Sequence, residues 1–562
     1  MRSDGLWFDP GGQHSEIWLT SAFVVEAEGR ALGGCNWSLV LAWADRDGRK
    51  HRAVIRRADL AGDGTDVRQM LADRGLTLAG GRGARERLAQ ALAGVSCTSR
   101  VTLAETTGWR DRAFVLPHRT IAKAGQEPVV YLGREAGTHF AEKGSLAEWQ
   151  DEVASSADGH HRLIFALALA LTGPLLEPLG MEGGGFHFFG PSSCGKTTLL
   201  RLAGSVWGGG GELGFGLTWR TTDNALEGVA AGHNHTLLAL DEIGQIDPKA
   251  LGDAAYALAN GQAKGRMRAN TDLRVRARWR VPVMSSGEIT LAERIREGGL
   301  GRKVRAGQET RIVDLPAEAG TGFGVFDHGG GHSSADPLAR AIREQTARLY
   351  GTAGPAFVEA LVSRPDMIEV ARTLVRAITD RLAPKGCDGQ IARVAARFAL
   401  VAAAGEIAIE CGILPYSVGT VADAVQRTYE AWLTRRGGAG RREDDVAIAL
   451  VSEFLQRFGE ARFAPWHGAA AKAEFGSLGF TSGRVIPDLA GWRRDGHFLI
   501  NPATWNEITR GYDGRAVAAA LAAAGYLERG SNGRNSQPVT VEGRKQRVYV
   551  IRASILEAGS DE

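Results

Sequence analysis

An eight-residue motif, Gly190 to Thr197 with the sequence GPSSCGKT, constrains this chain more than any other feature and has the spacing G-x-x-x-x-G-K-T. The apolar run GFHFF precedes it, and the amphipathic stretch TLLRLAG follows it. In this strand–loop–helix context, glycines let the loop wrap a phosphate while backbone N–H groups point at the anion. We therefore predict a mostly parallel α/β core with a phosphate-binding loop.

The side chains of this loop predict the ligand. The Lys196 ammonium would neutralise β/γ-phosphate charge, and the Thr197 hydroxyl would ligate Mg²⁺. The cofactors expected are therefore ATP and Mg²⁺. The residues predicted to bind ATP are Gly190, Pro191, Ser192, Ser193, Cys194, Gly195, Lys196, Thr197 and Thr198.

Two carboxylates follow the next apolar run, in the sequence TLLALDE that ends at Glu242. Parallel sheets bind ligands at the carboxyl ends of their strands. We predict that Asp241 holds Mg²⁺ together with Thr197 and that Glu242 polarises the attacking water. Taken alone, the pair also fits a solvated strand end, but its distance after the phosphate loop favours catalysis.

Two later strands supply further catalytic candidates. The run RVPVMSSGE ends in Ser285 and Ser286, and we expect this strand between the two motif strands, with either serine contacting the γ-phosphate or the water. A plain strand end is the alternative. In GQETRIVDL, Arg311 precedes an apolar strand and is expected to reach the γ-phosphate of a neighbouring subunit. Arg302 and Arg305 compete for this role, and a surface arginine is the other interpretation.

The segment from Lys264 to Arg305 is strongly basic, with twelve Lys/Arg and four Asp/Glu. Within it, cations alternate on both sides of Asn270-Thr271-Asp272, a pattern that predicts a hairpin with its cations on one face. Such a face suits a nucleic-acid backbone, although an edge hairpin protected against aggregation would look similar. The residues predicted to bind DNA are Lys264, Arg266, Arg268, Arg274, Arg276 and Arg278.

Length and composition limit the remaining possibilities. A chain of 562 residues exceeds a single core. With 44% hydrophobic residues and no apolar run of about 20 residues, it is not expected to enter a membrane. The acidic start argues against a secretory signal, so a cytoplasmic location is expected. Five scattered cysteines favour neither a disulfide framework nor a zinc site.

The order of elements predicts five regions. They are an N-terminal α+β domain (1–135), a helical lead-in (136–184), a P-loop ATPase core (185–316), a linker and helical lid (317–440) and a winged-helix-like C-terminal domain (441–562). In the last region, Arg529, Arg534, Arg544, Lys545 and Arg547 bracket a hairpin that follows a helix, a pattern that favours DNA binding, although winged helices also bind proteins.

The chain resembles the prokaryotic family called domain of unknown function 927 in the sequence of several segments, including PSSCGKTTLL, LDEI, YALANGQAKGR, SSGE and GQETRIVDLP. The resemblance extends over roughly residues 20 to 555. It implies AAA+ helicases of phages, plasmids and genomic islands, similar in layout to minichromosome-maintenance and superfamily-three helicases. By this resemblance Arg311 is similar to an arginine finger, Arg393 to a sensor-2 arginine and the basic hairpin to a pore hairpin.

Motifs and resemblance together predict a ring-forming DNA helicase, expected to be a hexamer, that draws single-stranded DNA through its pore to replicate a mobile genetic element. Relatives often accompany a primase, so a separate primase is an expected partner. Two alternatives stay open: an ATP switch for assembly or anti-phage defence, and a DNA-binding initiator with little turnover.

Overall fold

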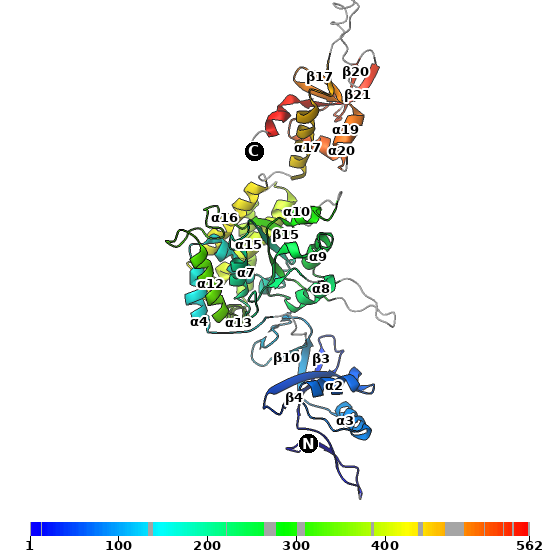
Figure 1. The fold of residues 1–562 in the computed structure, drawn as a ribbon, viewed down its shortest axis with the longest axis vertical. Coiled ribbons are helices and arrows are strands. Elements are labelled where there is room, and N and C mark those ends of the chain that lie inside the picture. Colours follow the sequence, from blue (N-terminus) through cyan, green and yellow to red (C-terminus); the bar gives the residue numbers. More distant parts are fainter. Residues whose placement is uncertain are drawn as a thin grey trace, which may run out of the picture. The chain divides into compact units, whose positions relative to one another are not determined.

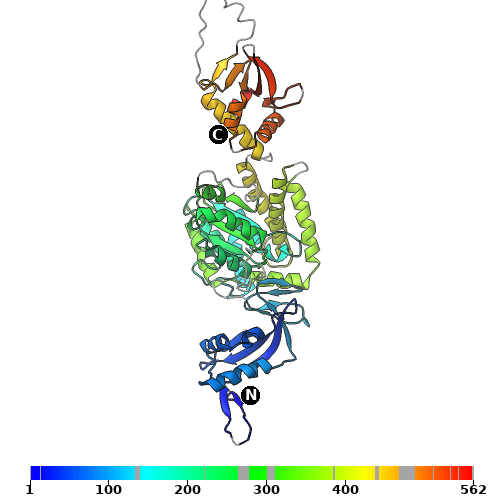
Figure 2. The same cartoon turned by 90° about the vertical axis from the view of Figure 1, so that its right-hand side faces the viewer.

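The computed structural model describes residues 2–12, 14–132, 139–220, 222–263, 277–299, 310–383, 387–436, 442–466, 488–510, 512–531, 533–541 and 544–559 (Figure 1, Figure 2). The chain forms two compact units. The first is Met1–Lys385 with Gly389–Trp432, and the second is Gly386–Asp388 with Leu433–Glu562. Within the described ranges, no helix combines the length and apolarity needed to cross a membrane.

The first unit begins with a small α+β region. Its main sheet has the order β10-β6-β3-β4-β5. Strands β1 and β2, which precede this sheet in the sequence, pair with each other. Side chains of α2 and α3 share one buried cluster with residues of β4 and β5. The bounds are β1 (Leu6–Phe8), β2 (Ile17–Thr20), β3 (Val24–Ala31), β4 (Ser38–Ala44), β5 (Lys50–Arg56), α1 (Arg57–Leu60), α2 (Thr65–Asp73), α3 (Arg82–Gly94), β6 (Arg100–Ala104) and β10 (Val129–Tyr131).

A three-stranded antiparallel sheet, β7 (Gly108–Arg110), β8 (Ala113–Val115) and β9 (Thr120–Ile121), connects this region to the centre of the unit. Just before it, the buried Thr107 hydroxyl lies 2.8 Å from the carbonyl oxygen of Asn234. The backbone N–H of Trp109 donates to Nδ1 of His235 at 3.0 Å. These contacts with a segment more than 120 residues away anchor the sheet.

Helices then lead into the central sheet. A capping box starts the first of them: the Ser145 hydroxyl accepts from the Glu148 backbone at 3.2 Å, and the Glu148 carboxylate accepts from the Ser145 backbone at 2.8 Å. The helices are α4 (Leu146–Glu148), the π-helix η1 (Trp149–Ala154), the 3₁₀-helix η2 (Ser155–Ala157), α5 (His161–Ala170) and α6 (Gly173–Leu176). Every residue of α5 is buried, because the helix packs against both α7 (Lys196–Gly204) and α15 (Gly389–Glu410).

The central sheet is entirely parallel and has the order β12-β13-β14-β11-β15. Its inner strands are almost wholly buried, as expected where helices cover both faces of a parallel sheet. The strands are β11 (Gly184–Phe189), β12 (Leu217–Thr218), β13 (Leu238–Asp241), β14 (Pro282–Gly287) and β15 (Ile312–Pro316). The predicted place of the 280–288 strand is confirmed, since β14 lies between β13 and β11.

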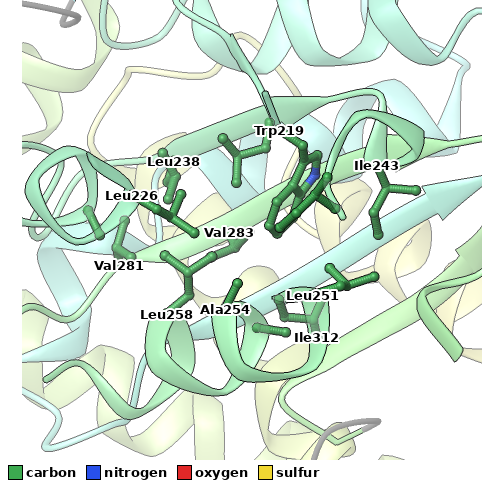
Figure 3. Packing of buried hydrophobic residues seen from close by; sticks show 14 of the residues in the cluster. Trp219, Leu226, Leu238, Ile243, Leu251, Ala254, Leu258, Val281, Val283 and Ile312 are labelled. Carbon is green, nitrogen blue, oxygen red and sulfur yellow. The ribbon is translucent and has the colours of Figure 1, made fainter. Parts of the chain in front are cut away.

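Helices α8 (Asp223–Gly232), α9 (Pro248–Asn260) and α10 (Leu291–Arg296) cover one face of this sheet, and α5 and α7 lie on the other (Figure 1). Between α9 and the strands, Leu251 and Leu258 pack with Leu238, Val283 and Trp219 (Figure 3). The short 3₁₀-helix η3 (Ile243–Gln245) follows β13.

The described residues that complete the first unit are mainly helical. Residues 317–335 form a connection rich in turns, after which the described residues form five helices. Of these, α14 and α15 pack together, and α15 also contacts α5. The helices are α12 (Asp336–Arg348), α13 (Ala353–Ser363), α14 (Met367–Leu382), α15 and α16 (Thr420–Arg435).

The second unit has its own apolar core, formed by α17, α19 and α20 against a sheet of order β16-β17-β18-β21-β19, with β20 paired to β21. The elements are α17 (Arg442–Phe458), β16 (Phe463–Pro465), β17 (Gly491–Arg494), β18 (His497–Ile500), α19 (Pro502–Ile508), α20 (Gly514–Ala523), β19 (Leu527–Glu528), β20 (Gln537–Val541), β21 (Arg544–Arg552) and η4 (Ala553–Gly559).

Candidate active site

The loop of residues 190–197, here called the GKT loop, joins the carboxyl end of β11 to the first turn of α7. Two of its residues have left-handed backbone angles: Ser193 with φ of 64° and Gly195 with φ of 99°. These angles fold the chain back so that the helix begins at Lys196, with its free N–H groups at the loop. Pro191 and Ser192 are exposed, which leaves the outer side of the loop open to solvent.

Inside the loop, the Lys196 ammonium donates to the carbonyl oxygens of Gly190 at 2.8 Å and Pro191 at 2.6 Å. The buried Cys194 sulfur lies 3.7 Å from the same nitrogen. Burial raises the pKa of the Cys194 thiol, so the sulfur stays neutral and does not compete for the charge of Lys196. The ammonium therefore lies among neutral groups at the mouth of the loop.

A hydrogen-bonded trio joins α7 to the ends of two neighbouring strands. The Thr197 hydroxyl donates to one oxygen of Asp241 at 2.9 Å. The Ser286 hydroxyl donates to the other oxygen, which also accepts the backbone N–H of Glu242 at 3.2 Å. The sheet order explains why these side chains meet: β14, which ends in Ser286, lies between β13, which ends in Asp241, and β11, which leads into the GKT loop. A hydroxyl and a carboxylate side by side fit Mg²⁺, which takes few protein oxygens and completes its shell with water and phosphate.

Glu242 follows Asp241 at the strand end but faces a different environment. Its backbone is left-handed, with φ of 57°, and its side chain is exposed. The Gln245 amide donates to its carboxylate. The turn thus separates the two carboxylates: Asp241 is buried against Thr197, and Glu242 is available to a water molecule outside the sheet.

The two serines of β14 have different surroundings. The Ser285 hydroxyl accepts from the Trp219 indole at 2.8 Å and lies 2.9 Å from Nδ1 of His187. Because Nε2 of His187 lies 3.0 Å from the carbonyl oxygen of Ile289, that nitrogen carries the proton and Nδ1 accepts from the serine. Burial lowers the pKa of His187 to about 4, which keeps the imidazole neutral. Of the two serines, Ser286 is therefore the one beside Asp241.

A segment that the motif search passed over packs directly on the GKT loop. The backbone N–H of Val325 donates to the carbonyl oxygen of Cys194 at 2.8 Å, and a Cβ added at Gly195 would lie 2.7 Å from Val325. Two residues later, Asp327 accepts from the backbone N–H of His161 at 2.7 Å, at the start of α5. The segment was expected to be only a glycine-rich linker. Its run GFGVFD was the available signal, since glycines permit this close approach.

Arg311 lies at the amino end of β15, the opposite edge of the sheet from the GKT loop, as the pairing of Gly185 with Ile312 shows. Its guanidinium lies 4.6 Å from the ring centroid of Tyr256 and 3.2 Å from the side-chain oxygen of Asn260, both on α9. Tyr256 is 46% exposed, so this arginine is held at the surface.

Arg393, on α15, has an exposed side chain. One turn later Arg397, which the sequence did not single out, donates to the carbonyl oxygens of Gly183 at 2.7 Å and Thr310 at 3.0 Å. Burial lowers the pKa of Arg397 to about 10, and the charge of Arg311 adds to this. Arg397 thus ties α15 to the starts of β11 and β15, at the same edge as Arg311.

The predicted basic hairpin falls mostly outside the described residues, as do Arg302 and Arg305. At its base, Gln262 and Arg278 form an antiparallel bridge, and the backbone N–H of Ala263 donates to the carbonyl oxygen of Ala277 at 3.0 Å. Arg278 is exposed. Lys264, Arg266, Arg268, Arg274 and Arg276 lie outside the described residues.

These features define a mixed α/β protein with a GKT loop and an acidic pair at the carboxyl edge of its parallel sheet. The model of the family described as "Domain of unknown function (DUF927)" matches residues 2–279 of this chain. The predicted resemblance to this family is confirmed over these residues, and its predicted extension to about residue 555 lies beyond the match.

A solved structure described as "SCCmec type IV Cch - active helicase" has the same fold. The similarity has a TM-score of 0.69 at 18% identity and covers 99% of this chain and 98% of the other. The shared fold therefore includes both units. No curated protein matches the chain.

Proposed function

We propose that the chain is an AAA+ ATPase that works as a DNA helicase or translocase. One observation carries the proposal: Lys196, Thr197, Asp241 and Ser286 come from three separate segments and meet at the carboxyl edge of one parallel sheet. With β11 counted first and β15 last, the sheet order is 5-1-4-3-2, so the strand of Ser286 lies between the strand of Asp241 and the strand that leads into the GKT loop. The fold shared with an active helicase supports the choice of helicase within the class.

Each group has a stated role in this proposal. Lys196 and the N–H groups of the GKT loop bind the β- and γ-phosphates. Thr197 and Asp241 hold Mg²⁺, and Ser286 orients the Asp241 carboxylate. Glu242, exposed beside them, orients the attacking water. Mg²⁺, when bound, neutralises phosphate charge during transfer.

The proposal also includes assembly. Arg311 is partly exposed at the amino ends of the strands, opposite its own GKT loop, and in this proposal it acts on the phosphate bound by a neighbouring copy in a ring, proposed to be a hexamer. Arg393, the proposed sensor-2 arginine, is exposed on α15 one turn before Arg397. Arg397 donates to the backbone at the starts of β11 and β15, the end of the sheet where Arg311 lies. The basic hairpin would line the pore and grip single-stranded DNA, and a separate primase would supply primers during replication of a mobile element.

The proposed function is tested by measuring ATP hydrolysis at two salt concentrations, each with and without single-stranded DNA. DNA should raise turnover, and higher salt should reduce that gain because phosphate contacts release counterions. Glu242→Gln should abolish hydrolysis while nucleotide still binds. Arg274→Ala should remove the DNA response, whereas Arg85→Ala, which removes an exposed arginine of α3, should not.

The outcomes separate the alternatives. Hydrolysis that ignores DNA under every condition would contradict the helicase proposal and favour an ATP switch for assembly or anti-phage defence. DNA binding without measurable turnover, unaffected by Glu242→Gln, would favour an initiator.

A further inference from the structure

The second unit carries a group of exposed cations on and beside its terminal hairpin. Strands β20 and β21 pair antiparallel, with Thr540 opposite Lys545 and Pro538 opposite Arg547. Lys545 and Arg547 are two residues apart, so they share one face of β21. Arg529, just after β19, joins them through a chain of neutral contacts: it donates to Asn535 at 3.2 Å, and Arg547 donates to the carbonyl oxygen of Ser536 at 2.8 Å.

These three cations keep their charge available. Arg529, Lys545 and Arg547 are all exposed, and within the described residues none of them forms an ion pair with a carboxylate. By contrast, Arg552 at the other end of β21 is paired with Glu528 at 3.2 Å. The three cations without a carboxylate partner thus lie on the hairpin and beside the start of β20, where a polyanion would meet them.

Two helices precede this hairpin in a tight turn. The indole of the buried Trp505 on α19 donates to the carbonyl oxygen of Gly514, the first residue of α20, at 3.2 Å. A Cβ at Gly514 would lie 3.0 Å from the Thr509 hydroxyl, so the helices pack closely. The inward side of α20 places Val517 and Leu521 in the core of the unit.

The solvent-exposed side of α20 consists mostly of alanine. Its exposed residues are Arg515, Ala516, Ala519 and Ala523. Alanine methyl groups neither donate nor accept hydrogen bonds, so they cannot read the base edges that distinguish one sequence from another. They do keep the helix narrow enough to approach the floor of a groove about 12 Å wide. Sequence reading would depend on Arg515 alone.

We propose that the second unit binds double-stranded DNA through its phosphate backbone, with little sequence discrimination. Arg529, Lys545 and Arg547 contact phosphates, and the alanine face of α20 lies in the groove. The surface is poorly suited to a protein partner, since interface cores are rich in aromatic and apolar residues. Among the described residues of this unit, Tyr512 is the only large hydrophobic side chain that is strongly exposed. This site is independent of ATP hydrolysis.

Fluorescence anisotropy with the full-length protein, a short labelled duplex and no nucleotide tests the proposal. Each phosphate contact contributes about 0.9 to the slope of log affinity against log salt. Raising salt from about 50 to 200 mM lowers the affinity of the wild-type protein by some factor. For the double variant Lys545→Ala/Arg547→Ala, that factor should be about tenfold smaller. The matched control Arg494→Ala removes an exposed cation from the β17–β18 hairpin, where it is paired with Asp495, and should leave the slope unchanged.

Two further measurements complete the test. Ala519→Glu places a negative charge on the exposed face of α20 and should weaken duplex binding, and unrelated duplexes should compete within about tenfold of one another, far below the 10³-fold or greater preference of a sequence-specific site. The proposal is overturned if the double variant keeps the wild-type affinity and slope, which would leave this face to a protein partner. It is equally overturned if one duplex sequence is strongly preferred or if Ala519→Glu has no effect. ATP turnover without DNA should be the same in all variants, so failure here is distinct from failure of the ATPase proposal.

Discussion

Replacing Ser285 by alanine should destabilise the first unit, because its hydroxyl is the centre of a buried polar trio. Trp219 donates to it at 2.8 Å, it lies 2.9 Å from Nδ1 of His187, and all three residues are 0% exposed. Removing the oxygen leaves an indole N–H and an imidazole nitrogen without partners and without access to water. Each such group costs about 1–3 kcal/mol, so we expect a loss of about 3 kcal/mol after partial relaxation.

Ser286→Ala is the matched comparison one residue away. It removes the hydrogen bond to Asp241 but leaves that carboxylate with Thr197 and the Glu242 backbone. A hydrogen bond to a charged group contributes about 1.5–3 kcal/mol. If its loss falls on the transition state, ATP turnover should drop about ten- to hundredfold.

Guanidinium denaturation followed by circular dichroism and steady-state ATP hydrolysis measure the two effects. Ser285→Ala should lower the denaturation midpoint and keep most of the turnover per folded molecule, whereas Ser286→Ala should do the reverse. Wild-type stability of Ser285→Ala would refute the energetic argument for the trio. Equal loss of turnover in both variants would refute the separation of roles.

Three other predictions follow from the same region. Tyr256→Ala should lower ATP turnover about two- to fivefold, whereas Tyr256→Phe should not, because a guanidinium over an exposed ring contributes about 0.5–1 kcal/mol to placing Arg311; equal kcat values for the two variants would contradict this. Gly195→Ala should weaken nucleotide binding in calorimetry and also lower the denaturation midpoint, because the added methyl meets Val325 at 2.7 Å in a left-handed backbone. Burial holds the pKa of His187 at about 4 against 6.5 in the unfolded chain, so protons favour unfolding and stability should fall as pH drops from 6.5 to 4, by up to about 3 kcal/mol. His187→Asn should flatten that pH dependence in denaturation curves, and an unchanged curve would argue against it.

The sequence determined the parts of this protein whose signals are local. The GKT loop needs a strand, two permissive backbone positions and a helix start, all within about a dozen residues, and the structure places them together. The capping box at Ser145 is equally local, because its donors and acceptors are three residues apart. The strand before Asp241 is an uninterrupted apolar run in the sequence, as expected of a strand that is buried on both faces of a sheet.

Tertiary structure decided what depends on residues far apart in the sequence. Ser285 and Ser286 are adjacent serines that the sequence does not distinguish. The position of β14 between β13 and β11 directs the Ser286 hydroxyl to Asp241 and the Ser285 hydroxyl to Trp219. The glycines of the run GFGVFD permitted a close approach but did not show that Val325 packs against Cys194, and the bonds from Arg397 to Gly183 and Thr310 gave no period or motif to detect. The physical reason is the same in each case: a hydrogen bond or van der Waals contact is set by positions in space, and a parallel sheet brings together strand ends that the chain separates by tens of residues.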